Sequence, residues 1–280
     1  MARMTEGQTE AILRFDRVTV GGADARALDG ISFAVASGAT LILFGAAGSG
    51  KTVLLKTALG LIRPDAGRVV LFGRDITDLK EEELFDIRGR VGVLFQEGGL
   101  FDSLTIEENV SYPLENQKVL QGLPVGERHR RAEEALRFVE LEHTLDKFPS
   151  ELSGGMRRRV GIARAIVTEP ALVLYDSPTA GLDPITAYTI ISLIVKGRDL
   201  RNTATVMATH RFQDGHFLAT SRFDRETGRI ERVDPDGGNH PEARTEFMVL
   251  REGQVVFEGG LQALLASSDP YISQFVRREE

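Results

Sequence analysis

A glycine-rich segment carries the clearest chemical signal in the sequence. The pattern G-x4-G-K-[ST] is matched by eight consecutive residues, Gly45, Ala46, Ala47, Gly48, Ser49, Gly50, Lys51 and Thr52. Glycines let a backbone wrap around phosphate groups, and a helix that begins at Thr52 adds the positive end of its dipole. Lys51 would then reach the β- and γ-phosphates, and the Thr52 hydroxyl would hold Mg²⁺. The alternative is a glycine-rich turn that only joins a strand to a helix.

The flanking sequence favours the phosphate-binding interpretation. Residues 40–44 form an almost wholly apolar run, which is typical of a strand buried on both faces, and residues 53–59 have a helical pattern. Asp176 ends a second apolar run at 171–175. A carboxylate at the tip of a buried strand beside such a loop can hold Mg²⁺ through its water shell. The alternative for Asp176 is an ordinary turn residue.

The elements that must position these residues are predicted as an α/β fold. Between about 97 and 165 the pattern turns helical, as in residues 127–141, and this predicts a helical subdomain inserted into an α/β core. In the C-terminal third, strands at 229–233 and 247–250 flank a polar loop at 234–244. Apolar and alternating runs predict the remaining strands at 12–15, 31–35, 40–44, 69–72, 91–95, 172–175 and 205–208.

Composition excludes several classes of protein. The 280 residues contain no Cys, which excludes disulfides, cysteine-ligated zinc, iron–sulfur clusters and thiol nucleophiles. The net charge of −7 argues against a nucleic-acid partner held by nonspecific attraction to phosphates. No apolar stretch approaches the roughly 20 residues that cross a bilayer, and the N-terminus lacks an apolar signal region. We therefore expect a soluble, non-secreted chain. The basic runs 128–131 and 157–159 are expected to be solvated helix faces rather than polyanion sites.

A phosphate loop alone leaves GTPases, small-molecule kinases, helicases and transport ATPases open. The absence of an N-K-x-D segment disfavours a GTPase. An ordered set of further motifs distinguishes among these classes. The motifs are Gln96 after the 91–95 run, the sequence LSGGM at 152–156, Asp176, the sequence AGLD at 180–183, and His210. On these residues the chain resembles the ATP-binding subunits of ABC transporters over nearly all its length.

The loop sequences at 95–110 and 149–156 look most like the Mla/MCE-type subunits that drive phospholipid transport. The resemblance implies an α/β P-loop NTPase of ABC type, with a RecA-like mixed sheet core, an antiparallel β subdomain and an inserted helical subdomain. It implies one ATP-binding domain over residues 10–280, preceded by a flexible N-terminus at 1–9. The core and β subdomain would comprise 10–96 and 166–280, and the helical signature subdomain 97–165.

The resemblance also implies ATP and Mg²⁺ as ligands. The nucleotide would contact the phosphate loop together with Val53 and Val20, and Mg²⁺ would be held by Thr52, Gln96 and, through water, Asp176. Gln96 would touch Mg²⁺ or the attacking water and would lie in the loop that couples the helical subdomain to a membrane partner. His210 would contact the γ-phosphate and order the water, although taken alone it reads as an ordinary histidine at the end of a strand.

The signature Ser153, Gly154 and Gly155 opens a helix and so forms a second anion site. In the family this site faces the γ-phosphate bound by the other protomer, and Asp183 lies in the D-loop. Two copies would close head to tail over two ATP molecules. The other partners implied are an integral membrane permease and an MCE-type lipid-binding protein. The chain would then be cytoplasmic, peripheral on the inner face of the cell membrane.

The sequence departs from the family pattern at the catalytic position. After Asp176 the family has a Glu that polarises the attacking water, whereas this chain has Ser177. A neutral hydroxyl cannot usefully accept a proton, and loss of a general base costs about 10²- to 10⁴-fold in rate. We predict intact ATP binding and dimer closure with slow turnover. The alternatives are a hydrolysis-deficient, nucleotide-dependent clamp or regulatory module, and an ATPase for a non-lipid cargo.

Two further departures lie outside the phosphate loop. The family stacks adenine on an aromatic side chain in the loop after the first strand, but the stretch 17–22 offers only Val20 for apolar contact. Phe15 is expected in the strand itself. The segment 216–246 is longer than a minimal subunit needs, and an exposed hairpin with a polar loop is favoured there over a partner site.

Overall fold

The central element of the chain is a six-stranded mixed sheet in the order β12-β11-β3-β8-β7-β6. The computed structural model describes residues 11–22, 25–95, 98–117, 120, 122–233 and 245–276. The five strands from β11 to β6 are parallel to their neighbours, and β12 is antiparallel to β11. The strands are β3 (Thr40–Phe44), β6 (Val91–Leu94), β7 (Leu172–Asp176), β8 (Ala204–Thr209), β11 (Thr245–Arg251) and β12 (Gln254–Gly259).

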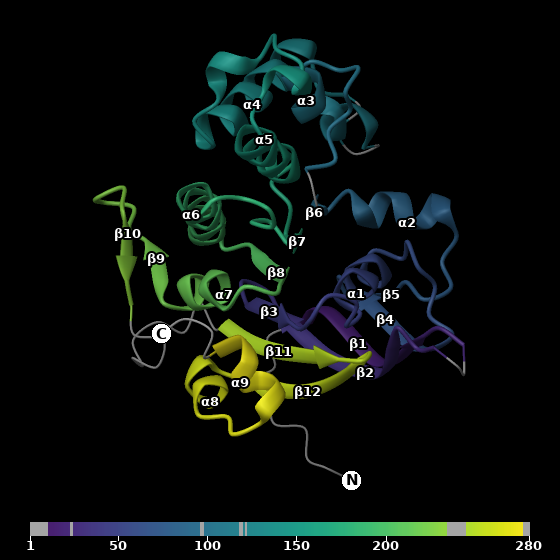
Figure 1. Ribbon diagram of the computed structural model, residues 1–280. Helices are drawn as coiled ribbons and strands as arrows, with labels where there is room; N and C mark the ends of the chain where they lie inside the picture. The colour runs from purple at the N-terminus through teal and green to yellow at the C-terminus, as the bar shows by residue number, and fades with distance from the viewer. Residues whose placement is uncertain are drawn as a thin grey trace.

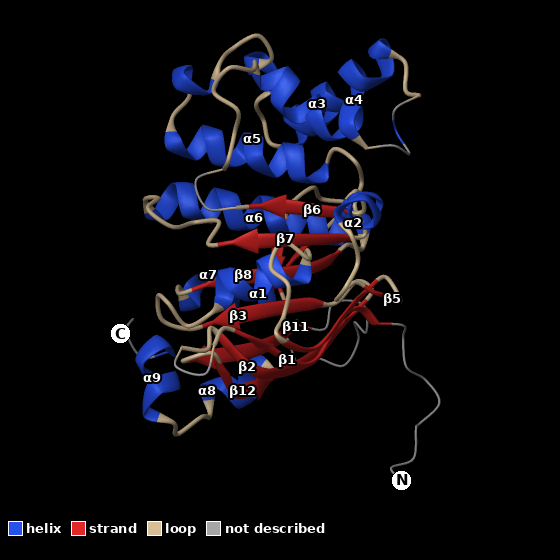
Figure 2. Cartoon of the chain, turned by 90° about the vertical axis from the view of Figure 1, so that its right-hand side faces the viewer, coloured by secondary structure: helices blue, strands red, loops and turns tan. Residues whose placement is uncertain are grey.

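A second, antiparallel sheet has the order β2-β1-β4-β5 and lies beside the lower strands of the main sheet (Figures 1 and 2). Phe15 pairs with Phe33 across two of its strands, and their rings stack with centroids 4.7 Å apart. Phe15 therefore belongs to the strand, as predicted. The strands are β1 (Ala11–Val20), β2 (Leu28–Ala36), β4 (Ala66–Leu71) and β5 (Arg74–Asp75).

Three helices between β6 and β7 form a separate layer, drawn at the top of Figures 1 and 2. These are α3 (Ile106–Asn116), α4 (Val125–Phe138) and α5 (Gly154–Ile166), with 3₁₀ turns η2 (Glu142–Thr144) and η3 (Pro149–Glu151). Among the described residues, no helix has the length and apolar character needed to span a membrane. The remaining helices are α1 (Lys51–Ala58), α2 (Glu81–Arg88), α6 (Pro184–Arg201), α7 (Phe212–Ala219), α8 (Leu261–Leu265) and α9 (Pro270–Val276).

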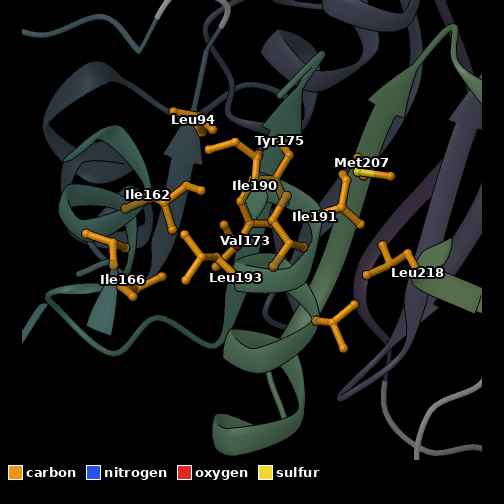
Figure 3. Packing of buried hydrophobic residues seen from close by; sticks show 14 of the residues in the cluster. Leu94, Ile162, Ile166, Val173, Tyr175, Ile190, Ile191, Leu193, Met207 and Leu218 are labelled. Atoms are coloured by element: carbon orange, nitrogen blue, oxygen red, sulfur yellow. The ribbon is translucent and has the colours of Figure 1, made fainter. Parts of the chain in front are cut away.

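Each face of the main sheet packs into its own hydrophobic core. Successive side chains of a strand point to opposite faces, so Leu41 and Leu43 join the core formed with α1 and the antiparallel sheet. Ile42 and Phe44 join the core formed with α5, α6 and α7. Figure 3 shows this second core, in which side chains of β7 and β8 contact those of α5 and α6. The two cores explain why β3 and β7 are apolar along nearly their whole length.

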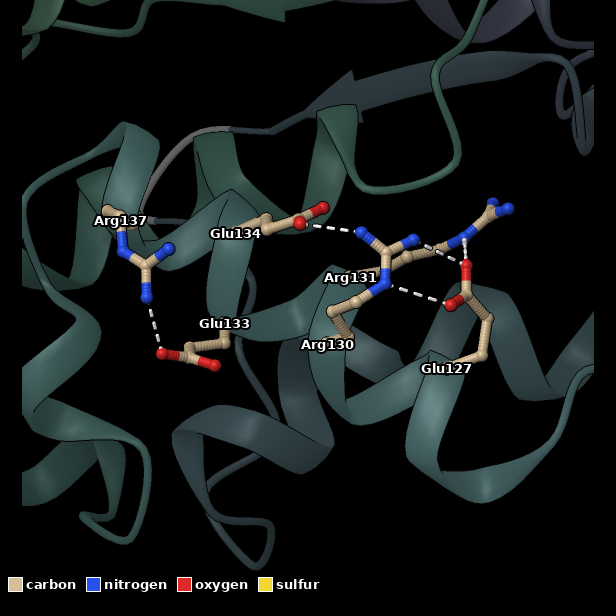
Figure 4. Close-up of polar contacts among 6 residues, drawn as sticks. All are labelled: Glu127, Arg130, Arg131, Glu133, Glu134 and Arg137. Carbon is tan, nitrogen blue, oxygen red and sulfur yellow. Dashed lines mark hydrogen bonds and ion pairs between the residues drawn. The ribbon is translucent and has the colours of Figure 1, made fainter.

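The two basic runs have different surroundings. On α4, Arg130 and Arg131 bind Glu127 along the helix surface, and Glu134 also contacts Arg130 (Figure 4). The expectation of a solvated face is confirmed there. For residues 157–159 it is wrong, because Arg158 is only 5% exposed and donates to the Ala180 carbonyl at 3.2 Å. The reason is that α5 is covered by α3 and α4 on one side and by β6 and α6 on the other.

The hairpin expected within residues 216–246 is present in part. Strands β9 (Ser221–Phe223) and β10 (Ile230–Arg232) pair antiparallel, whereas residues 216–219 belong to α7. The polar loop at 234–244 lies outside the described residues.

Candidate phosphate-binding site

The glycine-rich loop joins β3 to α1 and closes around a lysine. Gly50 precedes the helix with a φ of 106°, and a Cβ there would lie 2.4 Å from the Ala27 carbonyl oxygen, so only glycine fits. The Lys51 Nζ donates to the carbonyl oxygens of Gly45 at 2.7 Å and Ala46 at 2.8 Å. Burial lowers the pKa of Lys51, and the charge of Asp176 opposes this shift.

The parts of this loop that would meet a ligand are open. Ala46, Ala47, Gly48 and Thr52 are exposed, whereas Lys51 is 8% exposed. The backbone N–H groups at the start of α1 have no partner within the helix, and they carry the positive end of its dipole. The arrangement can therefore hold a phosphate group beside the buried ammonium.

Thr52 and Asp176, which are 124 residues apart in sequence, meet at the end of the sheet. The Thr52 hydroxyl donates to Asp176 Oδ2 at 2.7 Å, and Asp176 is 3% exposed. One hydroxyl and one carboxylate are the hard oxygen ligands that Mg²⁺ takes from a protein, with water and phosphate oxygens completing its octahedron. This donor set fits Mg²⁺. No group of three or more His, Asp or Glu side chains suited to a metal occurs among the described residues.

Ser177 and His210 follow the ends of two adjacent parallel strands. Asp176 pairs with Ala208, and Phe44 pairs with Thr209. Gly45, Ser177 and His210 therefore all lie at the carboxyl ends of the parallel strands. Ser177 has a φ of 50°, and its hydroxyl lies 3.2 Å from Asp176 Oδ1, to which it donates. The His210 side chain is exposed. Gln96 lies outside the described residues.

The signature begins α5, as the sequence predicted. Ser153 caps the helix, and its hydroxyl accepts from the Met156 N–H at 3.3 Å. Gly154 and Gly155 form the first turn, so the exposed start of α5 is a second place where N–H groups can meet an anion. Figures 1 and 2 both draw α5 in the upper helical layer, whereas α1 lies lower, beside β3.

Asp183 caps α6 and lies close to the signature. Its Oδ1 accepts from the N–H groups of Ile185 and Thr186, and its Oδ2 accepts from the Thr186 hydroxyl at 2.6 Å. The hydroxyl bond is the largest cause that lowers the pKa of Asp183. A Cβ on Gly155 would lie 2.5 Å from the Thr186 methyl carbon. The start of α6, which directly follows the D-loop, therefore packs against the signature within one chain.

The expectation that Val20 lies in the loop after the first strand is wrong. Val20 is the last residue of β1, pairs with Leu28 of β2 and is 9% exposed. Its side chain packs in the core beside the antiparallel sheet because the alternation of β1 points it inward. A side chain held there offers little surface to an adenine.

Sequence reasoning missed Tyr271, which contacts the phosphate loop from the C-terminal helix α9. Its hydroxyl accepts from the Ala46 N–H at 3.0 Å and donates to the Leu250 carbonyl at 3.0 Å. The tyrosine is 225 residues away from the loop, and no spacing in the sequence connects the two. It helps hold the start of the loop against β11.

The loop, the buried lysine and the Thr52–Asp176 pair at the end of a parallel sheet define a P-loop nucleotide-binding protein. More narrowly, the chain belongs to the ABC transporter family, since residues 28–180 match the model of that family, described as "ABC transporter". Its fold is that of ABC ATPase domains, which bind ATP with Mg²⁺.

Two groups of similar proteins are named as ATP-binding proteins of transport systems. The chain is 37% identical over 229 residues to the methionine import ATP-binding protein MetN of Rhizobium johnstonii, a match that covers 82% of this chain and 62% of that protein. It is 33% identical over 276 residues to the probable ribonucleotide transport ATP-binding protein mkl of Mycobacterium tuberculosis, covering 97% of this chain and 68% of that protein. The chain thus spans less than two thirds of the length of its MetN relative.

Solved structures share the fold. The ATP-binding cassette MJ0796, a dimer in a post-hydrolysis state bound to ADP and Pi, superposes with a TM-score of 0.73 at 28% identity, covering 89% of this chain and 98% of that one. CbiO1 of Clostridium perfringens, part of the ABC transporter complex CbiONQ, gives 0.74 at 26% identity, covering 95% of this chain and 94% of that one.

Proposed function

We propose that this chain binds Mg-ATP in the loop Gly45–Thr52, closes as a dimer around it, and hydrolyses it slowly to drive a membrane permease. The observation that carries the proposal is the pair of contacts at the phosphate loop. Lys51 is buried against the loop carbonyls, and Thr52 contacts the strand-end carboxylate of Asp176. A bound γ-phosphate would offer Lys51 stronger oxygen acceptors than the carbonyls that it now contacts.

The other site residues have roles within this proposal. Val53 would lie beside the nucleotide at the start of α1, and Mg²⁺ would be held by Thr52, by Gln96 and, through water, by Asp176. When bound, Mg²⁺ neutralises charge that develops on the phosphate oxygens. His210 would contact the γ-phosphate and order the attacking water. Residues 10–280 would form one ATP-binding domain, with the helical part at 97–165.

Slow turnover follows from the environment of Ser177. Its hydroxyl donates to Asp176, so it is a hydrogen-bond donor at the position where a carboxylate would accept a proton. Binding and closure do not need that proton transfer, because the charges of Lys51 and Mg²⁺ and the helix N-terminus provide the electrostatic part of the site. The same observation favours the second candidate function, a clamp that closes on ATP and does not turn over.

Introducing the missing carboxylate tests this proposal. We expect Ser177→Glu to raise the single-turnover rate of ATP hydrolysis by about 10²- to 10⁴-fold, because a general base contributes that much. Ser177→Gln is the matched control, since it has the same length without the charge and should give no gain. The readout is radiolabelled Pi release, with ATP affinity measured in parallel. Equal rates for the parent and Ser177→Glu would refute the role of residue 177, and undetectable ATP binding would refute the whole proposal.

A second copy and a permease are the proposed partners. The dimeric state of the cassette MJ0796 supports a dimer in which Ser153, Gly154 and Gly155 of one protomer face the nucleotide of the other, with Asp183 at the interface. A cavity of about 310 Å³ opens between α2, the end of α3 and residues 168–171, where Phe85 is 40% exposed. We assign this cavity to the permease, which would hold the chain on the cytoplasmic face of the membrane.

The proposed cargo is a phospholipid, on the strength of the loop sequences at 95–110 and 149–156, and an MCE-type lipid-binding protein belongs to this proposal. The names of the MetN relatives favour methionine as the competing cargo. Co-purification of the chain with its permease separates the two. Mass spectrometry should find phospholipid at stoichiometric levels after detergent exchange, and phospholipid rather than methionine should stimulate hydrolysis. Stimulation by methionine alone would overturn the lipid assignment.

A further inference from the structure

A buried carboxylate outside the recognised motifs lies between two loops of the candidate site. Asp214, in the first turn of α7, is 4% exposed. Its Oδ2 accepts from the Thr179 hydroxyl and, at 3.2 Å, from the Thr209 hydroxyl. Both threonines are 1% exposed. An unpartnered charge in such a place would be costly, so these bonds stabilise the carboxylate where it lies.

The two threonines belong to the loops that carry the proposed chemistry. Thr179 lies two residues after Ser177, in a turn closed by the Ala180 N–H, which donates to the Ser177 carbonyl at 3.1 Å. Thr209 is the last residue of β8 and directly precedes His210. Asp214 therefore joins the turn at Ser177 to the start of the His210 loop.

An arginine completes this network. The Arg211 N–H donates to the Thr209 hydroxyl oxygen at 3.0 Å, and the Arg211 Nε lies 3.6 Å from Asp214 Oδ1. The segment 209–211 is thus folded against the carboxylate. Burial raises the pKa of Asp214, and this is opposed by the bond from Thr179, the charge of Arg211, the bond from Thr209 and the charge of His210.

We propose that Asp214 is a positioning residue for ATP hydrolysis: by binding Thr179 and Thr209 together, it sets the position of residue 177 relative to His210. This inference rests on the proposed function. Asp214 acts through the two loops. Its importance follows from the geometry of phosphoryl transfer, in which a displacement of about 1 Å costs about 10²-fold in rate.

The test separates positioning from binding. In whichever of the parent and Ser177→Glu proteins turns over faster, we expect Asp214→Ala to lower the single-turnover rate by about 10- to 100-fold and to leave the ATP Kd within about threefold. Asp214→Asn should restore the rate to within about threefold. Both threonine hydroxyls donate to the same oxygen, and an amide oxygen in that position can accept both bonds.

Asp199→Ala is the matched control. Asp199 is also largely buried and also pairs with an arginine, Arg198. It lies in the last turn of α6, however, whereas the D-loop precedes the first turn of that helix, so loss of Asp199 should affect stability and not the rate of hydrolysis. If Asp214→Ala does not fold, Thr209→Val is the second variant, since valine has a shape similar to threonine. It removes one of the two threonine bonds to Asp214 together with the acceptor of the Arg211 N–H, and it should lower the rate about 10-fold.

The outcomes distinguish the two proposals. Normal ATP binding and hydrolysis with an unchanged rate in Asp214→Ala or Thr209→Val overturns the positioning role alone. A rate loss of the same size in Asp199→Ala, or in Asp214→Asn, overturns it as well. No ATP binding, or no hydrolysis in either parental background, overturns the proposed function together with this inference.

Discussion

A close contact at the signature offers a sharp test of how the helical layer packs on the core. Gly155 is the second residue of α5, and a Cβ on it would lie 2.5 Å from the Thr186 Cγ2 on α6. Optimal carbon–carbon separations are about 3.5–4.0 Å, so Gly155→Ala must open the contact by about 1 Å. The threonine cannot simply rotate away, because its hydroxyl bonds Asp183 Oδ2 at 2.6 Å and its β-branched side chain is stiff.

The expected magnitude comes from two opposing effects. Overpacking costs about 1–3 kcal/mol, and replacing glycine by alanine in a helix gains about 1 kcal/mol. Gly155→Ala alone should therefore lower the free energy of unfolding by up to about 2 kcal/mol. Thr186→Ser removes the clashing methyl and keeps the hydroxyl bond, so in that background the same change should be neutral or stabilising. The effect of Gly155→Ala should therefore differ between the parent and the Thr186→Ser background by a coupling energy of about 1–3 kcal/mol.

Urea unfolding of the parent, both single variants and the double variant measures this coupling, because the helix propensity cancels in the cycle. Gly154→Ala is the matched control. A Cβ on Gly154 meets no atom within 4 Å, so this change carries the propensity effect without the clash. A coupling energy below about 0.5 kcal/mol would refute the packing argument. So would an equal loss of stability in Gly154→Ala.

Two further predictions concern the core and the surface. Phe247 is fully buried on β11 and stacks on Phe44 with centroids 5.8 Å apart, so Phe247→Ala should lower the free energy of unfolding by about 3–5 kcal/mol; a loss below about 1 kcal/mol in urea would contradict that packing. The His129 Nδ1–H donates to Glu107 Oε1 at 2.6 Å, and this bond raises the pKa of His129, so NMR titration should place that pKa above the ordinary value of about 6.5, and Glu107→Gln should bring it back. The stabilisation from this pair is present below the pKa of the unfolded chain and is lost as the pH rises through the folded-state pKa; an unchanged His129 pKa in Glu107→Gln would contradict it.

Sequence alone was enough for features made by neighbouring residues. The phosphate loop between a buried strand and a helix, the start of α5 at the signature, and the carboxylate that ends β7 each depend on a few consecutive residues. Their backbone conformation is set locally, by glycine at positive φ, by a capping serine and by an apolar run. The substitution at Ser177 was equally visible, because it is a matter of residue identity at a known offset.

Features made by distant residues required the folded chain. Tyr271 reaches the phosphate loop across 225 residues, and Asp214 reaches Thr179 across 35. Neither contact can be recognised from the spacing of residues in the sequence, since both depend on the order of strands in the sheet and on which helix covers which face. Arg158 was misplaced for the same reason.

The type of each element follows from short-range periodicity, which is encoded within a few residues. Burial is decided by what packs on top of an element, and that partner comes from elsewhere in the chain. The sequence thus specified the phosphate-binding loop of this protein and the serine at position 177. Only the tertiary structure showed that Asp214 joins the turn at Ser177 to the start of the His210 loop, because this carboxylate acquires its partners when α7 packs against the ends of β7 and β8.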